Sequence, residues 1–318
     1  RLKAERNYGG SNNDLAYSIR QTLDSGFVIA GSSMSNNGDV GANFGNADYW
    51  VVKTDAAGNI QWEENYGGTS ADVAFSMTLT SDGGYALAGQ TQSANGDVGA
   101  NNGAYDYWVL KLDASGAILW SHNFGGSNSD LAKEIVETAD GGLMVAGTSF
   151  SADGDVGSNN GISDFWLLKL DAAGDQQWSR VFGGLSYDEA ESICQSADGG
   201  YVVVGLSRSS VGGGGGTNID NFWVVRTDVS GNLLWQRQYG GIGIEQAFSV
   251  LPASDGGFVI GGLSEFPTGD VGGNQGGWDM WLVKLASLPG SISGHVYLDN
   301  IENCVYETGD TTLAGIVV

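Results

Sequence analysis

The chain has 318 residues and a formal net charge of −24, because 37 acidic residues outnumber 13 basic ones. Such a field repels nucleic acids and anionic membrane surfaces, and no apolar run reaches the roughly 18 residues that a membrane span needs. The 53 glycines follow no Gly-X-Y period, while 10 Trp, 12 Tyr and 11 Phe residues supply bulk for a packed core. We therefore expect a folded protein with no nucleic-acid partner and no direct membrane insertion.

Four short strands are predicted in the first 66 residues. The segments 14–23, 26–34, 48–55 and 59–66 are rich in β-branched and aromatic residues and are bounded by turn residues. The sequence "DSG" joins the first two as a tight hairpin, and "DAAGN" joins the last two as a longer hairpin with a glycine. This pattern predicts an antiparallel four-stranded sheet.

The same pattern occurs five times. Gly-Gly pairs begin at residues 9, 67, 125, 183 and 240, so the period is 58 or 57 residues. A four-stranded sheet cannot bury both of its faces alone, and a repeat of this length predicts a β-propeller whose blades pack face to face. An open β-solenoid is the alternative. The tryptophans expected to fill the spaces between blades are Trp50, Trp108, Trp166, Trp223 and Trp281.

The two ends of the repeated region predict that the ring closes. The fifth copy runs into "LASLPGSIS" and lacks a fourth strand, whereas the chain begins with "LKAERNYGG", which aligns with "IQWEENYGG" at residues 60–68. The N-terminal strand would therefore complete the last blade. We predict an all-β chain in which residues 1–286 form a five-bladed β-propeller of four-stranded blades closed by the N-terminal strand.

A long loop, "SADGDVGSNNGISDFW", joins the second and third strands of the third copy at residues 151–166. In a propeller these loops share one rim with the "GGSNND"-type connections, and function is often carried by such loops. Asp and Asn oxygens recur at loop positions 1, 3, 7 and 12, which suits Ca²⁺; turns in which Asp caps backbone N–H groups are the alternative. The candidate metal ligands are Asp39, Asp48, Asp97, Asp106, Asp153, Asp155, Asn159, Asp164, Asp270 and Asp279.

Two further groups of side chains are candidates on this rim. An acidic residue opens the innermost strand of each blade, and the five would form a ring at the central channel that either holds a cation or accepts bonds from the adjacent Gly-Gly turns. Aromatic rings on the rim offer flat faces to a sugar, with packing over the loops as the alternative. The acidic ring is Asp14, Asp72, Asp130, Asp188 and Glu245, and the candidate ligand-binding aromatics are Phe44, Tyr105 and Trp278.

Catalytic signatures are missing from the sequence. Nothing resembles G-x-S-x-G, H-E-x-x-H or a P-loop, and neither Cys194 nor Cys304 lies in a nucleophile motif. Glycosidases need carboxylates in a defined asymmetric arrangement, but here nearly every acidic residue recurs with the repeat. We therefore expect that the protein is not an enzyme. Basic residues such as Lys53, two positions before Asp55, recur at the strand ends and predict either a repeated structural ion pair or a solvated strand tip.

The repeat ends before residue 287, and residues 287–290 form a predicted linker. The remaining sequence, "SISGHVYLDNIENCVYETGDTTLAGIVV", resembles the opening of the prealbumin-like, calcium-binding B-type repeats of bacterial surface adhesins. The resemblance implies that residues 291–318 begin a β-sandwich domain. It also implies a calcium-ligand set in this tail, consisting of Asp299, Asn303, Glu307 and Asp310.

The repeat, idealised as "GGSxxDxAxSIxxTxDGGYxxAGxTxSxxGDVxxNxGxxDYWVxKLDxxGNxxW", resembles repeats in large secreted proteins of gliding bacteria that use the type IX pathway. This resemblance covers residues 1–286 and implies an extracellular, cell-surface location with a binding or adhesive role. The expected partner is a cell-surface glycan or protein, or further copies of the chain in an assembly. A lectin and a purely structural subunit of a surface appendage are the alternatives.

Overall fold

The computed structural model describes residues 5–210 and 219–286, together with residues 297–298 and 311–312. The described part is all-β, and it contains no helix that could cross a membrane. Its strands are β1 (Asp14–Gln21), β2 (Phe27–Ser33), β3 (Asp48–Thr54), β4 (Ile60–Tyr66), β5 (Asp72–Leu79), β6 (Tyr85–Thr91), β7 (Asp106–Leu112), β8 (Ile118–Phe124), β9 (Asp130–Glu137), β10 (Leu143–Ser149), β11 (Asp164–Leu170), β12 (Gln176–Phe182), β13 (Asp188–Gln195), β14 (Tyr201–Ser207), β15 (Asn221–Thr227), β16 (Leu233–Tyr239), β17 (Glu245–Pro252), β18 (Phe258–Ser264), β19 (Asp279–Leu285), β20 (Tyr297–Leu298) and β21 (Thr311–Thr312).

Successive groups of four strands form antiparallel sheets, as the sequence predicts. The described residues contain four such sheets, β1–β4, β5–β8, β9–β12 and β13–β16, and a three-stranded sheet, β17–β19. The register repeats from sheet to sheet: Gly31 lies opposite Trp50, and Gly89 lies opposite Trp108. A glycine is required at Gly89, because a β-carbon there would lie 1.9 Å from the Val73 carbonyl oxygen. The chain therefore has a β-propeller-like fold of repeated sheets.

Apolar side chains between neighbouring sheets form the core. One cluster joins Tyr49 and Val51 of the first sheet to Met77, Leu87 and Trp108 of the second. The Tyr49 and Trp108 rings lie 4.2 Å apart, and equivalent ring pairs join each later sheet to its neighbour at 4.3–4.5 Å. We call the face of a sheet that packs on the next sheet its leading face, and the opposite face its trailing face. Trp108, Trp166, Trp223 and Trp281 lie between neighbouring sheets, as predicted. Trp50 packs on its own sheet and on Tyr8, because no described sheet precedes the first one.

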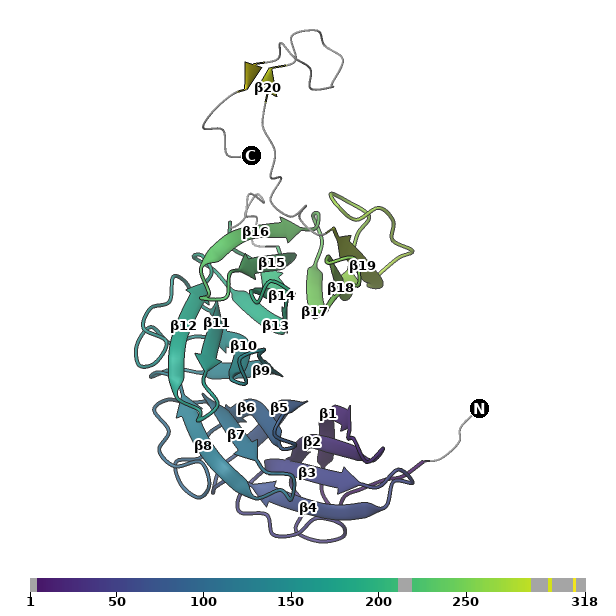
Figure 1. Ribbon diagram of the computed structural model, residues 1–318, viewed down its shortest axis with the longest axis vertical. Coiled ribbons are helices and arrows are strands. Elements are labelled where there is room, and N and C mark those ends of the chain that lie inside the picture. The colour runs from purple at the N-terminus through teal and green to yellow at the C-terminus, as the bar shows by residue number, and fades with distance from the viewer. Residues whose placement is uncertain (1–4, 211–218, 287–296, 299–310, 313–318) are drawn as a thin grey trace.

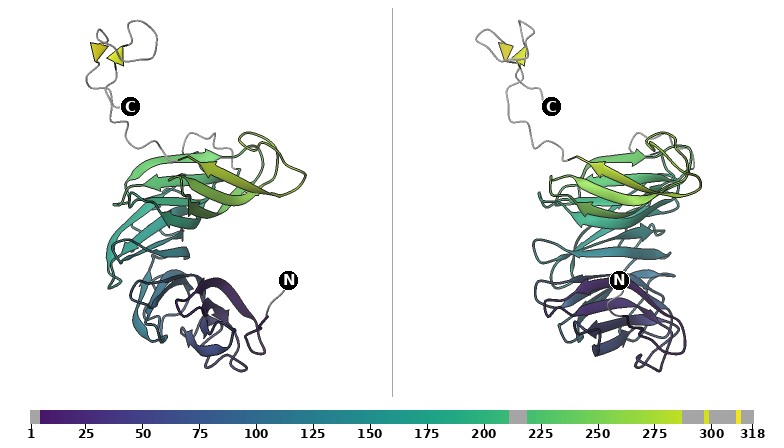
Figure 2. Two further views of the ribbon diagram at one scale, coloured as in Figure 1. Left: turned by 45° about the vertical axis from the view of Figure 1, so that its right-hand side comes forward. Right: turned by 90° about the vertical axis from the view of Figure 1, so that its right-hand side faces the viewer.

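The five sheets follow one another around an open arc, with the first and last sheets at its two ends (Figures 1 and 2). The predicted pairing of the N-terminal strand with β19 is not present among the described residues, and residues 5–13 are not in a strand. As a result, Met280 and Leu282 on the leading face of the last sheet are 98% and 71% exposed. On the trailing face of the first sheet Ile19 is 55% exposed, whereas the equivalent Met77 is 0% exposed.

The basic residue at the end of each third strand forms an ion pair, but its partner differs from the sequence prediction. Lys53 lies 2.8 Å from Asp24 in the first hairpin of its sheet, not beside Asp55. The reason is that Asp55 accepts N–H bonds from Ala57 and Asn59 within its own turn. The same pairing occurs as Lys111–Asp82, Lys169–Asp140, Arg226–Asp198 and Lys284–Asp255.

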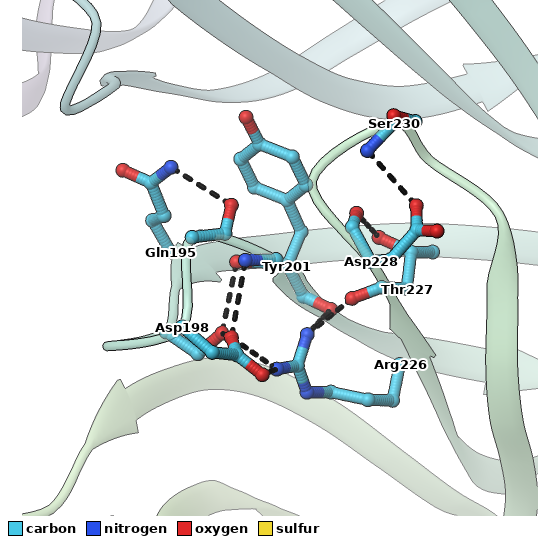
Figure 3. A network of polar contacts seen from close by, with 10 residues as sticks. Gln195, Asp198, Tyr201, Arg226, Thr227, Asp228 and Ser230 are labelled. Carbon is cyan, nitrogen blue, oxygen red and sulfur yellow. Dashed lines mark hydrogen bonds and ion pairs between the residues drawn. The ribbon is translucent and has the colours of Figure 1, made fainter.

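Figure 3 shows this network in the fourth sheet, where the guanidinium of Arg226 bridges two hairpins. One nitrogen donates to both carboxylate oxygens of Asp198 at 2.6 Å, and another donates to the carbonyl oxygens of Tyr201 and Thr227. A buried cation with this many acceptors fixes the two hairpins to each other. The hairpin end of each sheet is therefore a structural element.

Candidate functional site

The opposite end of the sheets carries the candidate functional site, a rim built from two kinds of loop. The long loop from each second strand to its third strand contacts both the Gly-Gly connection that precedes its own sheet and the connection that follows it. Asp39 N–H donates to Gly9 O at 3.0 Å, and Asp72 N–H donates to Ala47 O at 2.6 Å. Parallel bridges at Ala47–Ala71, Tyr105–Ser129 and Ser163–Tyr187 repeat the second contact. The loops of neighbouring sheets therefore form one connected surface, as the sequence predicts.

Side-chain oxygens cap each Gly-Gly turn. In the third repeat four consecutive N–H groups, from Gly125 to Asn128, donate to side-chain oxygens of the same repeat. The acceptors are Asp155 at 3.1 Å, Asp130 at 2.8 Å, Asp153 at 2.7 Å and Ser151 at 3.0 Å. The N–H of Ser127 beside it lowers the pKa of Asp153. Two of the candidate metal ligands in this loop therefore accept backbone hydrogen bonds.

The other two candidate ligands of the third loop, Asn159 and Asp164, brace the loop itself. Asn159 accepts the Gly161 N–H at 2.8 Å and donates to Ser149 O at 2.9 Å, while Asp164 accepts the Asn160 N–H at 2.6 Å. The first, second and fifth loops repeat this arrangement: Asp39, Asp97 and Asp270 each accept a Gly-Gly N–H, and Asp48, Asp106 and Asp279 each accept a loop N–H. Among the described residues, no group of three or more His, Cys, Asp and Glu side chains is arranged to hold a metal ion.

The predicted acidic ring residues contact their own repeats. Asp130 accepts the Gly126 N–H at 2.8 Å and the Ser151 hydroxyl at 2.8 Å, and it also accepts from Ser149. Asp14, Asp72, Asp188 and Glu245 accept the same N–H from the Gly-Gly turn four residues earlier. These contacts are those of a carboxylate that caps its own turn.

One carboxyl group in each of the first three loops is fully buried and has an oxygen without a partner. Oδ1 of Asp48, Asp106 and Asp164 accepts no hydrogen bond from the described residues. Burial raises the pKa of Asp48 to about 7, and it raises the pKa of Asp106 and Asp164 to about 6. In the fourth sheet Asn221 takes the equivalent position. The sequence predicts these three residues as candidate metal ligands at position 12 of their loops, but it does not predict that they are buried.

The three candidate ligand-binding aromatics lie in different repeats and are not brought together. Phe44 and Trp278 are exposed on the first and fifth loops. Tyr105 lines a cavity of about 640 Å³ between the second and third sheets, together with Gln90, Asn128, Ser129, Leu131 and Phe150. Sequence analysis missed these partners because they lie in three separate segments that only the packed sheets bring together. The tail candidates Asp299, Asn303, Glu307 and Asp310, like the linker 287–290, lie outside the described residues.

Similar proteins are known at low sequence identity. No family model matches the chain. The regulatory protein FlaEY of Caulobacter vibrioides is 28% identical over 179 residues, which are 53% of this chain and 19% of that protein, so the chain spans about a fifth of this relative's length. A protein described as a gluconolactonase is 12% identical with a TM-score of 0.42, and covers 86% of this chain and 76% of its own. A levansucrase of B. megaterium is 11% identical with a TM-score of 0.39, and the match covers 89% of this chain and 87% of the levansucrase chain.

The same comparisons correct the prediction that the protein is not an enzyme. Solved structures similar to this chain include the gluconolactonase, the levansucrase and a thermostable family-43 glycoside hydrolase. The missing catalytic motifs and the symmetry of the acidic residues therefore do not exclude that this chain is an enzyme.

Proposed function

We propose that the five sheets are the blades of a closed five-bladed propeller, in which the N-terminal segment completes the last blade. Tyr8 supports this arrangement. Its hydroxyl donates to Gly58 O at 2.7 Å, and Tyr66, on the fourth strand of the first sheet, donates in the same way to Gly116 O of the second. The N-terminal segment thus contacts the first sheet as a fourth strand of a preceding blade does.

The exposed faces at the two ends of the arc also support closure. Met280 and Leu282 take the positions of Tyr49 and Val51, which are fully buried at the first junction. Ile19 and Trp50 on the first sheet take the positions of Met77 and Trp108 on the second. The two faces are the two halves of one repeated interface, so their contact would bury apolar area at both ends.

The function that this geometry supports best is binding at an extracellular surface: the loop rim meets a cell-surface glycan or protein, or a further copy of the chain. The observation that carries the proposal is a set of large apolar side chains exposed on a rim that is otherwise fixed by hydrogen bonds. Loops that a rigid scaffold positions commonly carry the residues that bind a partner. The exposed rim residues are Phe44, Ile162, Leu185, Ile242, Phe266 and Trp278. The extracellular location and the start of a β-sandwich at residues 291–318 rest on sequence resemblance.

Binding to cells of the organism that encodes the chain tests this function. A variant with Phe44→Ser, Phe266→Ser and Trp278→Ser removes three exposed rim side chains. The matched control, Leu119→Ser with Leu234→Ser, removes two leucines that are similarly exposed on the outer strands β8 and β16. Flow cytometry with the labelled chain should show a loss of about tenfold or more for the rim variant and little change for the control. Equal binding by the rim variant and the unmodified chain contradicts the proposal.

Calcium is the proposed cofactor of the loops. The supporting observation is the buried Oδ1 of Asp106 and Asp164, since a cation would supply the missing partner of an ionised oxygen. Thermal unfolding after chelation tests the proposal, with calcium or magnesium added back. A calcium-specific rise of the midpoint that Asp106→Asn reduces supports it. An unchanged midpoint contradicts it.

A further inference from the structure

We propose that the cavity between the second and third sheets binds a neutral carbohydrate. This inference rests on the proposed binding role of the rim and names a ligand class for one site on it. The cavity measures about 640 Å³, which is within the usual range for small-molecule sites. Its walls come from β6, from the end of the second long loop, from the connection that precedes β9, and from the residues at either end of the third loop.

Several polar side chains in the cavity wall have no partner among the described residues. The side-chain amide of Gln90 and the hydroxyl groups of Tyr105 and Ser129 make no hydrogen bond there, and Asn128 uses its Nδ2 on Phe150 O at 3.1 Å while its Oδ1 accepts nothing. The wall therefore offers both donors and acceptors from amide and hydroxyl groups. Sugar hydroxyls need this combination, because each of them donates one hydrogen bond and accepts others.

Apolar groups lie beside these polar ones. The rings of Tyr105 and Phe150 and the side chains of Leu131 and Ile162 line the same cavity. A sugar ring has apolar C–H faces between its hydroxyl groups, so a wall that mixes aromatic surface with amides matches it. Ordinary ligand sites show the same mixture of apolar walls with a few polar groups that fix orientation.

The charge of the wall selects a neutral ligand. None of the residues that line the cavity is charged, although the chain carries a net charge of −24. An anionic ligand would meet the repulsive field of the protein, and a cationic one would find no carboxylate in the wall. A peptide ligand is also disfavoured, because backbone groups at the cavity already pair with each other: Phe150 N–H donates to Ser129 O at 2.9 Å, and Asp130 N–H donates to Tyr105 O at 2.6 Å.

The cavity departs from the repeat symmetry. Ala47 and Ser163 take the position of Tyr105 at the neighbouring junctions, as the bridges Ala47–Ala71 and Ser163–Tyr187 show. Ser32 and Thr148 likewise take the position of Gln90. The fold therefore does not require a tyrosine or a glutamine here, which favours a role in binding for both residues.

Saturation-transfer NMR with neutral methyl glycosides of glucose, galactose, mannose and N-acetylglucosamine tests the inference on the whole chain. We expect at least one glycoside to receive saturation, and Tyr105→Ala to weaken its binding about tenfold or more. Gln90→Leu keeps the side-chain volume and removes the amide, so it should also weaken binding and serves if Tyr105→Ala misfolds. Phe248→Ala, a change of an exposed aromatic residue on β17 that does not line the cavity, is the matched control and should leave binding unchanged.

Two outcomes overturn the inference: no glycoside is saturated, or binding is equal in Gln90→Leu and the unmodified chain. The cell-binding assay separates this failure from failure of the proposed function. If the rim variant loses cell binding while no glycoside binds, the rim still binds a partner and the carbohydrate assignment is wrong. If glycosides bind while the rim variant keeps its cell binding, the carbohydrate site stands and the proposed use of the whole rim is wrong.

Discussion

Replacing Asp48 by asparagine tests whether burial beneath the first loop disfavours the ionised form of this carboxyl. Oδ2 of Asp48 accepts the Phe44 N–H at 2.5 Å, whereas Oδ1 has no partner, and the side chain is fully buried. Burial, together with the nearby Asp72 and Asp97, raises the pKa of Asp48 to about 7. Asn221 has the same register position in the fourth sheet, so the fold accommodates a neutral amide there.

The sign of the effect follows from the two pKa values of Asp48. The carboxyl has its ordinary pKa of 3.8 in the unfolded chain and a pKa of about 7 in the folded protein. Between these values the folded protein binds the proton more tightly, so the stability that this group contributes is full at low pH and is lost as the pH rises toward 7. The difference between these two pKa values corresponds to about 4 kcal/mol, and screening by water at the loop lowers the effect to about 1–3 kcal/mol. We expect Asp48→Asn to raise the free energy of unfolding by this amount at pH 8 and to change it little at low pH.

Urea unfolding followed by tryptophan fluorescence across this pH range, in a chelated buffer, measures the effect. The control is Asp55→Asn, an exposed carboxylate whose pKa is lowered by hydrogen bonds from the Asn59 side chain and backbone. The stabilising contribution of Asp55 is present at neutral pH and is lost at low pH. Asp55→Asn should therefore lower the free energy of unfolding at neutral pH, whereas Asp48→Asn should raise it. The reasoning is refuted if Asp48→Asn destabilises the protein equally at low and high pH.

Two further substitutions test other parts of the structure, each against a matched control. Gly125→Ala would bring a β-carbon within 2.3 Å of Asp106 Oδ1 and 2.8 Å of Asp130 Oδ2, so chemical denaturation should show that the free energy of unfolding falls by about 2–4 kcal/mol. The control Gly272→Ala, with nothing within 4 Å of the added β-carbon, should show little change, and equal losses in the two variants would contradict the steric argument. Lys111→Met removes a buried ammonium that pairs with Asp82 and donates to Leu112 O, so the free energy of unfolding should fall by about 1–3 kcal/mol. The control Lys284→Met removes a half-exposed ion pair and should lower the free energy of unfolding by about 0–1 kcal/mol. A larger drop of the unfolding midpoint in Lys284→Met than in Lys111→Met would contradict the role of burial.

The sequence predicts the repeated sheets well because each feature of a strand occurs five times. The alternation of apolar residues and the hairpin glycines indicate the first three strands in every copy and the fourth strand in four of the five copies. The partner of Lys53 was not predictable from spacing alone. Asp55 is nearer in sequence, but the hairpin of the neighbouring strands brings Asp24 to 2.8 Å.

The candidate site was predicted only in part. The sequence indicates a rim of Asp-rich loops, and one of its two interpretations is that the loop Asp side chains cap backbone N–H groups. It does not predict that the groups capped by Asp153 and Asp155 belong to the Gly-Gly turn. The cavity around Tyr105 could not be predicted, because Gln90 and Phe150 belong to different sheets and approach each other only when the sheets pack. A comparison of the repeats finds the residues that the copies share. The cavity instead depends on Tyr105, a residue in which the second copy differs from its neighbours.

The central claim is that the first and last sheets meet, so that all five loops form one rim. In the first sheet Val51 lies opposite Glu64, and the equivalent pair in a closed ring is Leu282 opposite Arg6. The direct measurement is mass spectrometry of the oxidised chain carrying Arg6→Cys and Leu282→Cys, with Cys304→Ser to remove a competing thiol. Closure predicts an intrachain disulfide between positions 6 and 282. It predicts far less disulfide when the cysteine replaces Glu5 instead of Arg6, because neighbouring residues of a strand point to opposite faces. Disulfides only between copies, or none at either position, would contradict a closed ring.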